Sequence, residues 1–294
     1  MTIVLMWSWN YKNNLSLCKY AINIEGCLIT SDKRLYNRSD GVIVQNRRLH
    51  QNISGLPQLP RPSFQKWVWM NKESPKHTRL IPGAEKLFNL TSTYRFDSDI
   101  PQPYGSIVAE ESQGDLALPI KDKLVCWIVS NWHKYHERFI YYNEFRKHIN
   151  IVVFGKKFGG HISREEYHRI IASCKFYLSF ENSIFKDYIS EKFYNALSLG
   201  TVPVVLGPPR DNYERIIQGD AFIHVNDFNS SKELADYLLL LDKNEAKYLK
   251  YFEWRRHFKV KSGPSILNTA CRVCDHLRSH KEKETIDLVQ WYWH

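Results

Sequence analysis

Long apolar runs are absent from this 294-residue sequence. No run approaches the roughly 20 apolar residues that a membrane-spanning helix requires. The opening residues 1–9, MTIVLMWSW, are too short and have the wrong flanks for a signal peptide. They predict a first buried strand instead.

Clusters of basic residues are also absent, although the formal net charge is +10 and the pI is about 9.2. Nucleic-acid-binding arms contain Lys/Arg-rich runs, and here the basic residues are dispersed. A small anionic ligand, or simply a solvated basic surface, therefore explains the charge better than nucleic acid does.

Only one CxxC pair occurs, Cys271 with Cys274, among six cysteines. A structural zinc site needs a second CxxC or a close histidine pair, and a redox CxxC normally lies near the start of its domain. The even cysteine number and five Asn-x-Ser/Thr sequons together favour an oxidising, glycosylating compartment. The sequons begin at Asn14, Asn37, Asn52, Asn89 and Asn229.

Short apolar runs alternate with helical patterns between residues 120 and 241. Nearly continuous apolar runs are typical of parallel strands that helices cover on both faces. The runs occupy 124–129, 149–154, 176–180, 201–207 and 221–225, and helices are predicted at 133–148, 163–173 and 190–199. This half of the chain predicts a Rossmann-like α/β domain.

Residues 1–115 also have a mixed pattern, with strands predicted at 2–7, 41–45 and 66–70. The stretch 101–122 predicts a linker. The aromatic C-terminus, DLVQWYWH, is predicted to pack against the protein. Two α/β domains with a cleft between them are the simplest architecture.

The stretch 176–192, FYLSFENSIFKDYISEK, joins a predicted strand to a predicted helix. Ligands bind beyond the carboxyl ends of the strands in such sheets, and helix N-termini attract anions. Ser190 is placed to cap the helix, Lys192 to add positive charge, and Glu191 to accept hydrogen bonds from ribose hydroxyls. The pattern favours a nucleoside diphosphate, although Glu191 and Lys192 also fit plain surface charges.

Neither GxGxxG nor GxxxxGK[S/T] occurs, so a phosphate site here would depend on helix ends and cationic side chains. Ser130 and Asn131 follow the strand at 124–129. Arg138 is placed to reach the same edge of the sheet and clamp phosphate oxygens, unless it is only a helix-surface residue. Asp97-Ser-Asp has the form of a DxD metal motif, but we expect structural carboxylates there because it lies in the other domain.

The stretch 176–207, which ends in EKFYNALSLGTVPVVLG, resembles the signature of the α1,3-fucosyltransferase family. FQKWVWMNKESPKHT (64–78) and TYRFDSDIPQPYG (93–105) extend the resemblance over nearly the whole chain. The resemblance implies a GT-B fold, in which two Rossmann-like α/β domains face each other across a cleft. It also implies GDP-fucose as donor and an inverting transfer without metal or other cofactor.

The cysteine placement and the WVWM…ESP pattern resemble vertebrate-type Golgi enzymes that fucosylate N-acetyllactosamine. The expected product is fucose on the GlcNAc 3-hydroxyl, a Lewis-x type structure, on glycoprotein or glycolipid acceptors. The resemblance implies an acceptor domain at 1–118, a GDP-fucose domain at 119–260, and a segment at 261–294 that returns to the first domain.

Glu73 of NKESP matches the proposed general base of the family, with loop capping as the alternative role. Arg138 and Lys192 would then stabilise charge on the departing GDP. The implied donor site comprises Ser130, Asn131, Arg138, Tyr177, Asn182, Tyr188, Glu191 and Lys192. For Asn182 a turn cap, and for the two tyrosines core packing, are the alternatives.

Arg47 of QNRR resembles the Arg of relatives that act on type 2 chains, although the His-His-Arg-Asp pattern around it is lost. Trp69 and Tyr104 are candidates for stacking on acceptor sugars, or else core residues. The family pattern implies the disulfides Cys18–Cys271, Cys27–Cys274 and Cys126–Cys174. It also implies a single-pass type II protein of the Golgi lumen, with an N-terminal membrane anchor outside this chain.

Two other interpretations stay open. One is a related fucosyltransferase that acts on the N-glycan core GlcNAc or another acceptor. The other is a non-catalytic relative that binds nucleotide sugars or glycans, which the presence of Glu73, Arg138, Glu191 and Lys192 disfavours.

Overall fold

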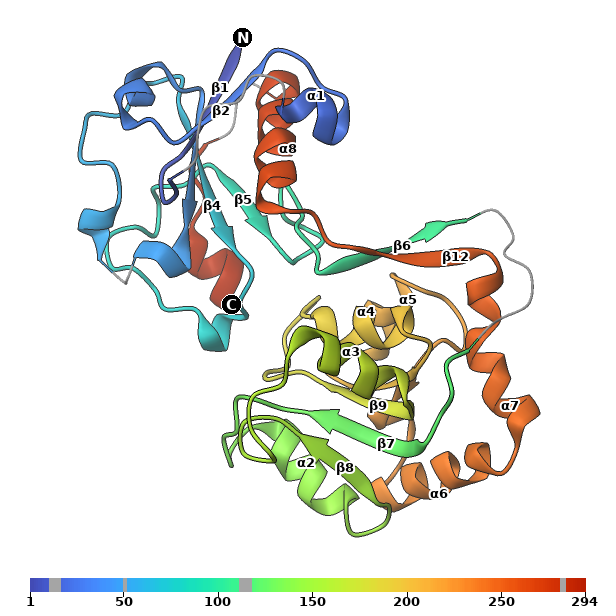
Figure 1. The fold of residues 1–294 in the computed structure, drawn as a ribbon. Helices are drawn as coiled ribbons and strands as arrows, with labels where there is room; N and C mark the ends of the chain where they lie inside the picture. The colour runs from blue at the N-terminus through green and yellow to red at the C-terminus, as the bar shows by residue number, and fades with distance from the viewer. Residues whose placement is uncertain (11–16, 50–51, 111–117, 281–283) are drawn as a thin grey trace. The chain divides into compact units, whose positions relative to one another are not determined.

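Parallel β-sheets organise both halves of the chain (Figure 1). The computed structural model describes residues 1–10, 17–49, 52–110, 118–280 and 284–294. They form two units, Met1–Pro103 with Gly263–His294, and Tyr104–Ser262. Each unit contains a five-stranded sheet accompanied by helices, which confirms the predicted α/β class.

The sheet of the first unit has the order β2-β1-β3-β4-β5, and all neighbouring strands are parallel. The strands are β1 (Thr2–Met6), β2 (Cys27–Thr30), β3 (Gly41–Gln45), β4 (Lys66–Asn71) and β5 (Leu90–Thr93). β1, β3 and β4 correspond to the three predicted strands. β2 and β5 have only four residues each, and the apolar pattern does not reveal them.

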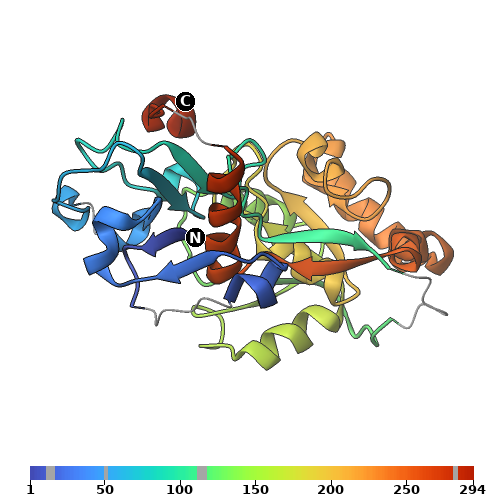
Figure 2. The same cartoon turned by 90° about the horizontal axis from the view of Figure 1, so that it is seen from above.

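Helix α8 (Ile266–Ser279) brings the end of the chain back to this sheet. It packs against α1 (Leu17–Ile22) and β1, as Figures 1 and 2 show. The disulfides Cys18–Cys271 and Cys27–Cys274 are confirmed. They join residues 253 and 247 positions apart, so they restrict the unfolded chain and tie α8 to the first strands.

The aromatic C-terminus packs against the first unit, as predicted. The Tyr292 ring centroid lies 4.7 Å from that of Trp69, and the Asn71 amide donates to the Tyr292 hydroxyl at 3.1 Å. The Arg95 guanidinium lies 4.3 Å from the ring centroid of Trp291. The last residues therefore support the end of β4, where Asn71 is the final residue.

The sheet of the second unit has the order β11-β10-β9-β7-β8, and its neighbouring strands are also parallel. The strands are β7 (Lys123–Ile128), β8 (Ile151–Phe154), β9 (Cys174–Phe180), β10 (Val202–Leu206) and β11 (Ile223–His224). All five lie where the apolar runs predict them, and only the edge strand β8 has no fully buried residue.

Helices cover both faces of this second sheet (Figure 1). Val125 and Trp127 of β7 pack with residues of α2 and α6, whereas Cys126 packs with residues of α3 and α4. The helices are α2 (Glu137–Phe145), α3 (Arg164–Ala172), α4 (Glu191–Ser198), α5 (Arg210–Glu214), α6 (Ser231–Asp242) and α7 (Glu245–Leu249). α2 begins four residues later than predicted, since the segment after β7 forms a loop.

The predicted linker at 101–122 is wrong in part, because it contains a strand. β6 (Gly105–Ala109) pairs antiparallel with β12 (Phe258–Ser262). Since its partner strand lies far along the chain, local sequence gives no sign of this pairing. The second unit accordingly begins at Tyr104 rather than at residue 119.

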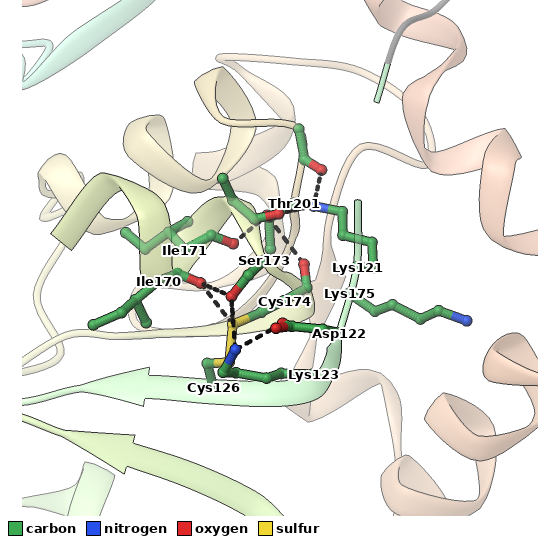
Figure 3. Close-up of a disulfide and its surroundings, with 12 residues drawn as sticks. Lys121, Asp122, Lys123, Cys126, Ile170, Ile171, Ser173, Cys174, Lys175 and Thr201 are labelled. Carbon is green, nitrogen blue, oxygen red and sulfur yellow. Dashed lines mark hydrogen bonds and ion pairs between the residues drawn. A yellow bond between two sulfur atoms is a disulfide. The ribbon is translucent and has the colours of Figure 1, made fainter. Parts of the chain in front are cut away.

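The third predicted disulfide, Cys126–Cys174, joins β7 to β9 and is also confirmed (Figure 3). Nearby, the Lys121 ammonium donates to the Ala172 carbonyl at 2.8 Å and to the Thr201 hydroxyl at 3.0 Å. Burial and the neighbouring Arg255 lower the pKa of Lys121 to about 7. These contacts fix the edge of the sheet opposite the candidate site, at the amino end of β7.

Candidate active site

A cavity of about 750 Å³ lies at the carboxyl ends of β7, β8 and β9 in the second unit. This is the edge where parallel sheets bind ligands. Seven of the eight residues predicted to hold the donor line it: Ser130, Asn131, Arg138, Tyr177, Asn182, Glu191 and Lys192. The structure therefore brings together side chains from four separate segments of the chain.

Tyr188, the eighth predicted residue, does not line this cavity. It is only 2% exposed, and its ring centroid lies 6.4 Å from that of Tyr104. Burial lowers the pKa of Arg138, and the nearby Tyr188 hydroxyl partly offsets this effect. Tyr188 thus packs in the wall behind the cavity, which is the core role named above as its alternative.

Among the residues that line the cavity, Arg138 is the best placed to bind an anion. It lies in the first turn of α2, is 4% exposed, and donates to the backbone carbonyl of Asn131. Its Nε atom is buried and has no hydrogen-bond partner among the described residues. Burial lowers the pKa of the guanidinium, and Glu181 and the two nearby tyrosines partly offset this effect. A buried cation with an unused donor fits a phosphate oxygen.

Lys192 extends from the first turn of α4 and is less free than the sequence suggests. Its ammonium donates to the Ser190 hydroxyl at 2.6 Å and pairs with Glu181 at 3.1 Å and with Glu191 at 3.5 Å. Burial lowers the pKa of this ammonium, but Glu181 and Glu191 together raise it above its ordinary value. Lys192 is thus a charged donor that has internal partners before any ligand arrives.

Ser190 is the N-cap residue of α4, but its side chain does not cap the helix. The Ser190 hydroxyl and backbone N–H instead both donate to the Glu181 carboxylate, at 2.9 and 2.7 Å. The predicted side-chain cap is therefore wrong, because a buried carboxylate competes for the hydroxyl.

Glu191 and Tyr177 occupy other parts of the cavity wall. The Glu191 side chain is 52% exposed, so its carboxylate can accept hydrogen bonds from a ligand. Burial raises the pKa of Tyr177 well above its ordinary value, so its hydroxyl remains protonated and able to donate. The assignment of Glu191 to a ribose stays a prediction.

The loop after β8 supplies further lining residues that the sequence reasoning missed: Gly155, Lys156, Gly160, His161 and Ile162. Gly155 has a φ of 123°, and a Cβ there would lie 2.1 Å from the Val129 carbonyl oxygen. Only glycine allows the loop after β8 to approach the backbone after β7 so closely. The signal was present in the sequence, since a basic, glycine-containing loop directly follows a predicted strand.

Glu73 and Arg47 lie together in the first unit, just beyond the end of β4. Arg47 Nη1 is 3.6 Å from Glu73 Oε1, and the two side chains are 79% and 35% exposed. The backbone carbonyl of Glu73 accepts hydrogen bonds from the Tyr292 hydroxyl and the Asn71 amide. The backbone is thus held in place while the carboxylate remains accessible, as a general base requires.

The two aromatic residues proposed for acceptor stacking are placed differently. Trp69 is 1% exposed, its Nε1 donates to the Asn46 side chain at 3.1 Å, and its ring packs on Tyr292. Tyr104 belongs to the second unit and packs beside Tyr188. Trp69 is therefore a core residue in this structure, since its ring is not accessible to a sugar.

The Asp97-Ser-Asp motif has structural partners, as expected. Arg95 pairs with Asp97 at 2.7 Å, and the Asp99 carboxylate accepts from the Thr91 backbone N–H at 2.8 Å. Over the described ranges, no group of three or more His, Cys, Asp or Glu side chains is arranged to hold a metal ion. The motif therefore stabilises the turn after β5.

The sequons differ in accessibility. Asn37, Asn52 and Asn229 are exposed, whereas Asn14 lies outside the described residues. Asn89 is 4% exposed, and its side-chain oxygen accepts from the Trp67 backbone N–H at 3.0 Å. Asn89 is therefore not accessible to a glycan in the folded chain, and its occupancy stays a prediction.

Within the described parts, no helix has the length and apolarity that a membrane crossing requires.

An α/β unit with a cation-lined cavity at the carboxyl ends of its strands has the features typical of α/β proteins that bind nucleotides. The model of "Glycosyltransferase family 10 (fucosyltransferase) C-term" matches residues 118–292, and that of "Fucosyltransferase, N-terminal" matches residues 1–105. The chain belongs to glycosyltransferase family 10, the fucosyltransferases.

Similar proteins are known from several mammals. The rat 4-galactosyl-N-acetylglucosaminide 3-alpha-L-fucosyltransferase 9 is 49% identical over 295 residues, which cover 99% of this chain and 82% of the rat protein. The human protein of the same name is 48% identical over the same coverage. An identity of this level over nearly the whole chain supports the same fold throughout.

Solved structures share the fold at lower identity. A crystal structure of an α1,3-fucosyltransferase with GDP-fucose has a TM-score of 0.62 and 15% identity, and covers 97% of this chain and 92% of that one. A structure of an α1,3-fucosyltransferase with GDP has a TM-score of 0.56 and 14% identity, and covers 86% and 81% of the two chains. This likeness agrees with the predicted GT-B fold.

Proposed function

We propose that this enzyme transfers L-fucose from GDP-fucose to the 3-hydroxyl of GlcNAc in N-acetyllactosamine-type glycans. The product would be of the Lewis-x type. The observation that carries the proposal is the cavity of the second unit, where the buried Arg138, the charged Lys192 and the exposed Glu191 converge. The family membership and the names of the mammalian relatives support fucose and lactosamine as the transferred sugar and its acceptor.

The donor part of the proposal follows from charge and placement. A nucleoside diphosphate bears negative charge on its phosphates and neutral hydroxyls on its ribose. Arg138 and Lys192 are cations that fit the phosphates, whereas Glu191 accepts hydrogen bonds from hydroxyls. The Tyr177 hydroxyl and the Asn182 amide add neutral donors at the same wall.

The chemical step would need a base and a stabilised leaving group. Glu73 would take the proton of the acceptor hydroxyl as that oxygen attacks the anomeric carbon of fucose, which inverts the configuration there. The bond from fucose to phosphate breaks, and Arg138 and Lys192 stabilise the charge that develops on GDP. In this proposal no metal ion takes part, and residues of both units are needed.

The acceptor site would include Arg47, which lies beside Glu73 and exposes most of its side chain. A guanidinium there can donate hydrogen bonds to hydroxyls of the acceptor glycan while it orients the carboxylate. Trp69 would act indirectly, because it supports the strand that ends before Glu73.

We also propose the Golgi lumen as the location, with a membrane anchor N-terminal to this chain. Three disulfides connect all six cysteines, which fits an oxidising compartment. The exposed sequons at Asn37, Asn52 and Asn229 fit a glycosylating one.

A transfer assay on an array of defined glycans tests the proposal. With GDP-fucose and EDTA present, we expect fucosylation of type 2 lactosamine glycans. Transfer to the N-glycan core GlcNAc alone would assign a different acceptor, and transfer that requires an added divalent metal would contradict the metal-free mechanism. Binding of GDP without transfer to any glycan would point to a non-catalytic relative.

A further inference from the structure

Glu181 is a buried carboxylate directly behind the cavity. It follows β9, is 3% exposed, and does not line the cavity itself. Its carboxylate accepts hydrogen bonds from the Ser190 backbone N–H at 2.7 Å, the Ser190 hydroxyl at 2.9 Å and the Lys192 ammonium at 3.1 Å. A buried carboxylate is stable only with such partners, so these contacts fix the first turn of α4.

Charged side chains from several elements surround the Lys192 ammonium. Glu181 from the end of β9 and Glu191 from α4 attract the ammonium, while Arg138 from α2 repels it. From α3, Tyr167 lines the same cavity. The Lys192 side chain is 18% exposed, so part of it reaches the cavity while Glu181 holds it from behind.

We propose that Glu181 is the internal counter-ion of the donor cavity: it holds Lys192 in place and charged before the ligand binds, and then shares it with the diphosphate. The inference rests on the proposed function, since it takes the ligand to be GDP or GDP-fucose. Glu181 is a positioning residue, because it would act on the ligand only through Lys192 and Ser190.

The effect of pH follows from the same contacts. Burial alone favours a neutral amine, and the carboxylates reverse this, so the pKa of Lys192 lies above its ordinary value. The Lys192 ammonium is therefore charged at neutral and at mildly alkaline pH. Without the charge of Glu181, only Glu191 would oppose the lowering of the Lys192 pKa by burial and by Arg138, so this pKa should fall. The side chain would then lose its proton at a lower pH than in the wild type.

The test is the dissociation constant of GDP, measured for the full chain by calorimetry at about pH 7.5 and 8.5, where the phosphates of GDP are ionised and its guanine base is still largely neutral. The wild type should change less than about two-fold between these values. Glu181→Gln keeps the shape of the side chain but removes its charge. It should bind GDP within about three-fold of the wild type, or more tightly, at the lower pH, and several-fold more weakly at the higher one.

Three controls isolate the role of the charge. Glu181→Gln combined with Lys192→Met should lose the pH dependence, because no titrating amine remains. Guanosine, which lacks the phosphates, should bind with no difference between the variants. Glu214→Gln removes an exposed carboxylate that pairs with Arg210 in the same unit, and it should behave like the wild type. A Glu181→Gln curve parallel to the wild type would overturn the inference.

A measurement on the wild type decides the matter if Glu181→Gln does not fold. At about pH 8.5, where the guanine base is largely neutral, GDP binding in two buffers of different ionisation enthalpy should show no proton uptake, because Lys192 is already charged. An uptake of about one proton would overturn the inference. Failure of the wild type to bind GDP at all would instead refute the proposed function.

Discussion

The two units contain parallel sheets of the same size but place their functional charges in different ways. In the second unit two cations of the cavity are largely buried: Arg138 is 4% exposed, and the Lys192 side chain is 18% exposed and pairs with the buried Glu181. In the first unit the side chains of Glu73 and Arg47 are 35% and 79% exposed. The proposed donor cavity therefore has its charges held in place by the protein, whereas in the first unit the carboxylate of Glu73, the proposed base, stays accessible.

The difference extends to the way each unit is supported. Helices cover both faces of the second sheet, and one continuous segment of the chain, Tyr104–Ser262, builds its core. The first unit needs α8 and the aromatic C-terminus, which two disulfides tie to it. Substitutions in the second unit should mainly change donor affinity, and substitutions near Glu73 should mainly change the rate of transfer.

The largest effect is expected for Glu73→Gln. The amide cannot accept the proton of the acceptor hydroxyl, so kcat should fall about 10³-fold, within the range that general bases contribute. The dissociation constant of GDP should stay within about two-fold of the wild type. Steady-state kinetics and calorimetry measure the two quantities.

A matched control is Glu25→Gln, which removes an exposed carboxylate that pairs with Lys19 in the same unit. It should leave kcat unchanged. A loss of GDP affinity in Glu73→Gln as large as its loss of rate would break the division between the units and remove Glu73 from the role of base.

A smaller effect is expected for Arg138→Met. The loss of a buried cation with a free donor should weaken GDP binding about 30-fold, since a charge-assisted hydrogen bond is worth roughly 2 kcal/mol. The KM for the acceptor should not change. Arg146→Met alters an exposed arginine at the other end of α2 and serves as the control. Equal GDP affinities for the two variants would contradict the assignment of Arg138.

The smallest effect is expected for Arg47→Ala. An exposed ion pair contributes about 0.2–1 kcal/mol, so kcat/KM for the acceptor should fall no more than about five-fold. GDP affinity should stay the same, because Arg47 and the donor cavity belong to different units. Arg48→Ala, which changes the neighbouring residue, is the control. A change in GDP affinity with unchanged acceptor kinetics would assign Arg47 to the donor site and contradict its proposed role at the acceptor.

Sequence patterns predicted the second unit well, because its strands are short, continuous apolar runs. They predicted the first unit less completely, since β2 (CLIT) and β5 (LTST) include polar residues and form no continuous apolar run. β6 was hidden in an apparent linker because its partner, β12, lies about 150 residues away along the chain. Pairings between distant segments cannot be read from local composition.

The residue types of the cavity were predictable, but their partners were not. The motif around Lys192 indicated a cation at a helix start, yet gave no sign that Glu181 is buried behind it. The sequon at Asn89 and the ring of Trp69 are similar cases, because burial decides their roles and depends on packing across the sheet. The disulfides were predictable only through the family resemblance, which fixes the pairing that spacing leaves open.

The most direct test of the account is the structure of the product formed from GDP-fucose and N-acetyllactosamine. Nuclear magnetic resonance of the purified trisaccharide identifies both the hydroxyl that receives the fucose and the configuration at its anomeric carbon. We expect fucose on the GlcNAc 3-hydroxyl, with the configuration inverted relative to the donor. Fucose on another hydroxyl, or with the configuration of the donor retained, would contradict the roles proposed for Glu73 and the donor cavity.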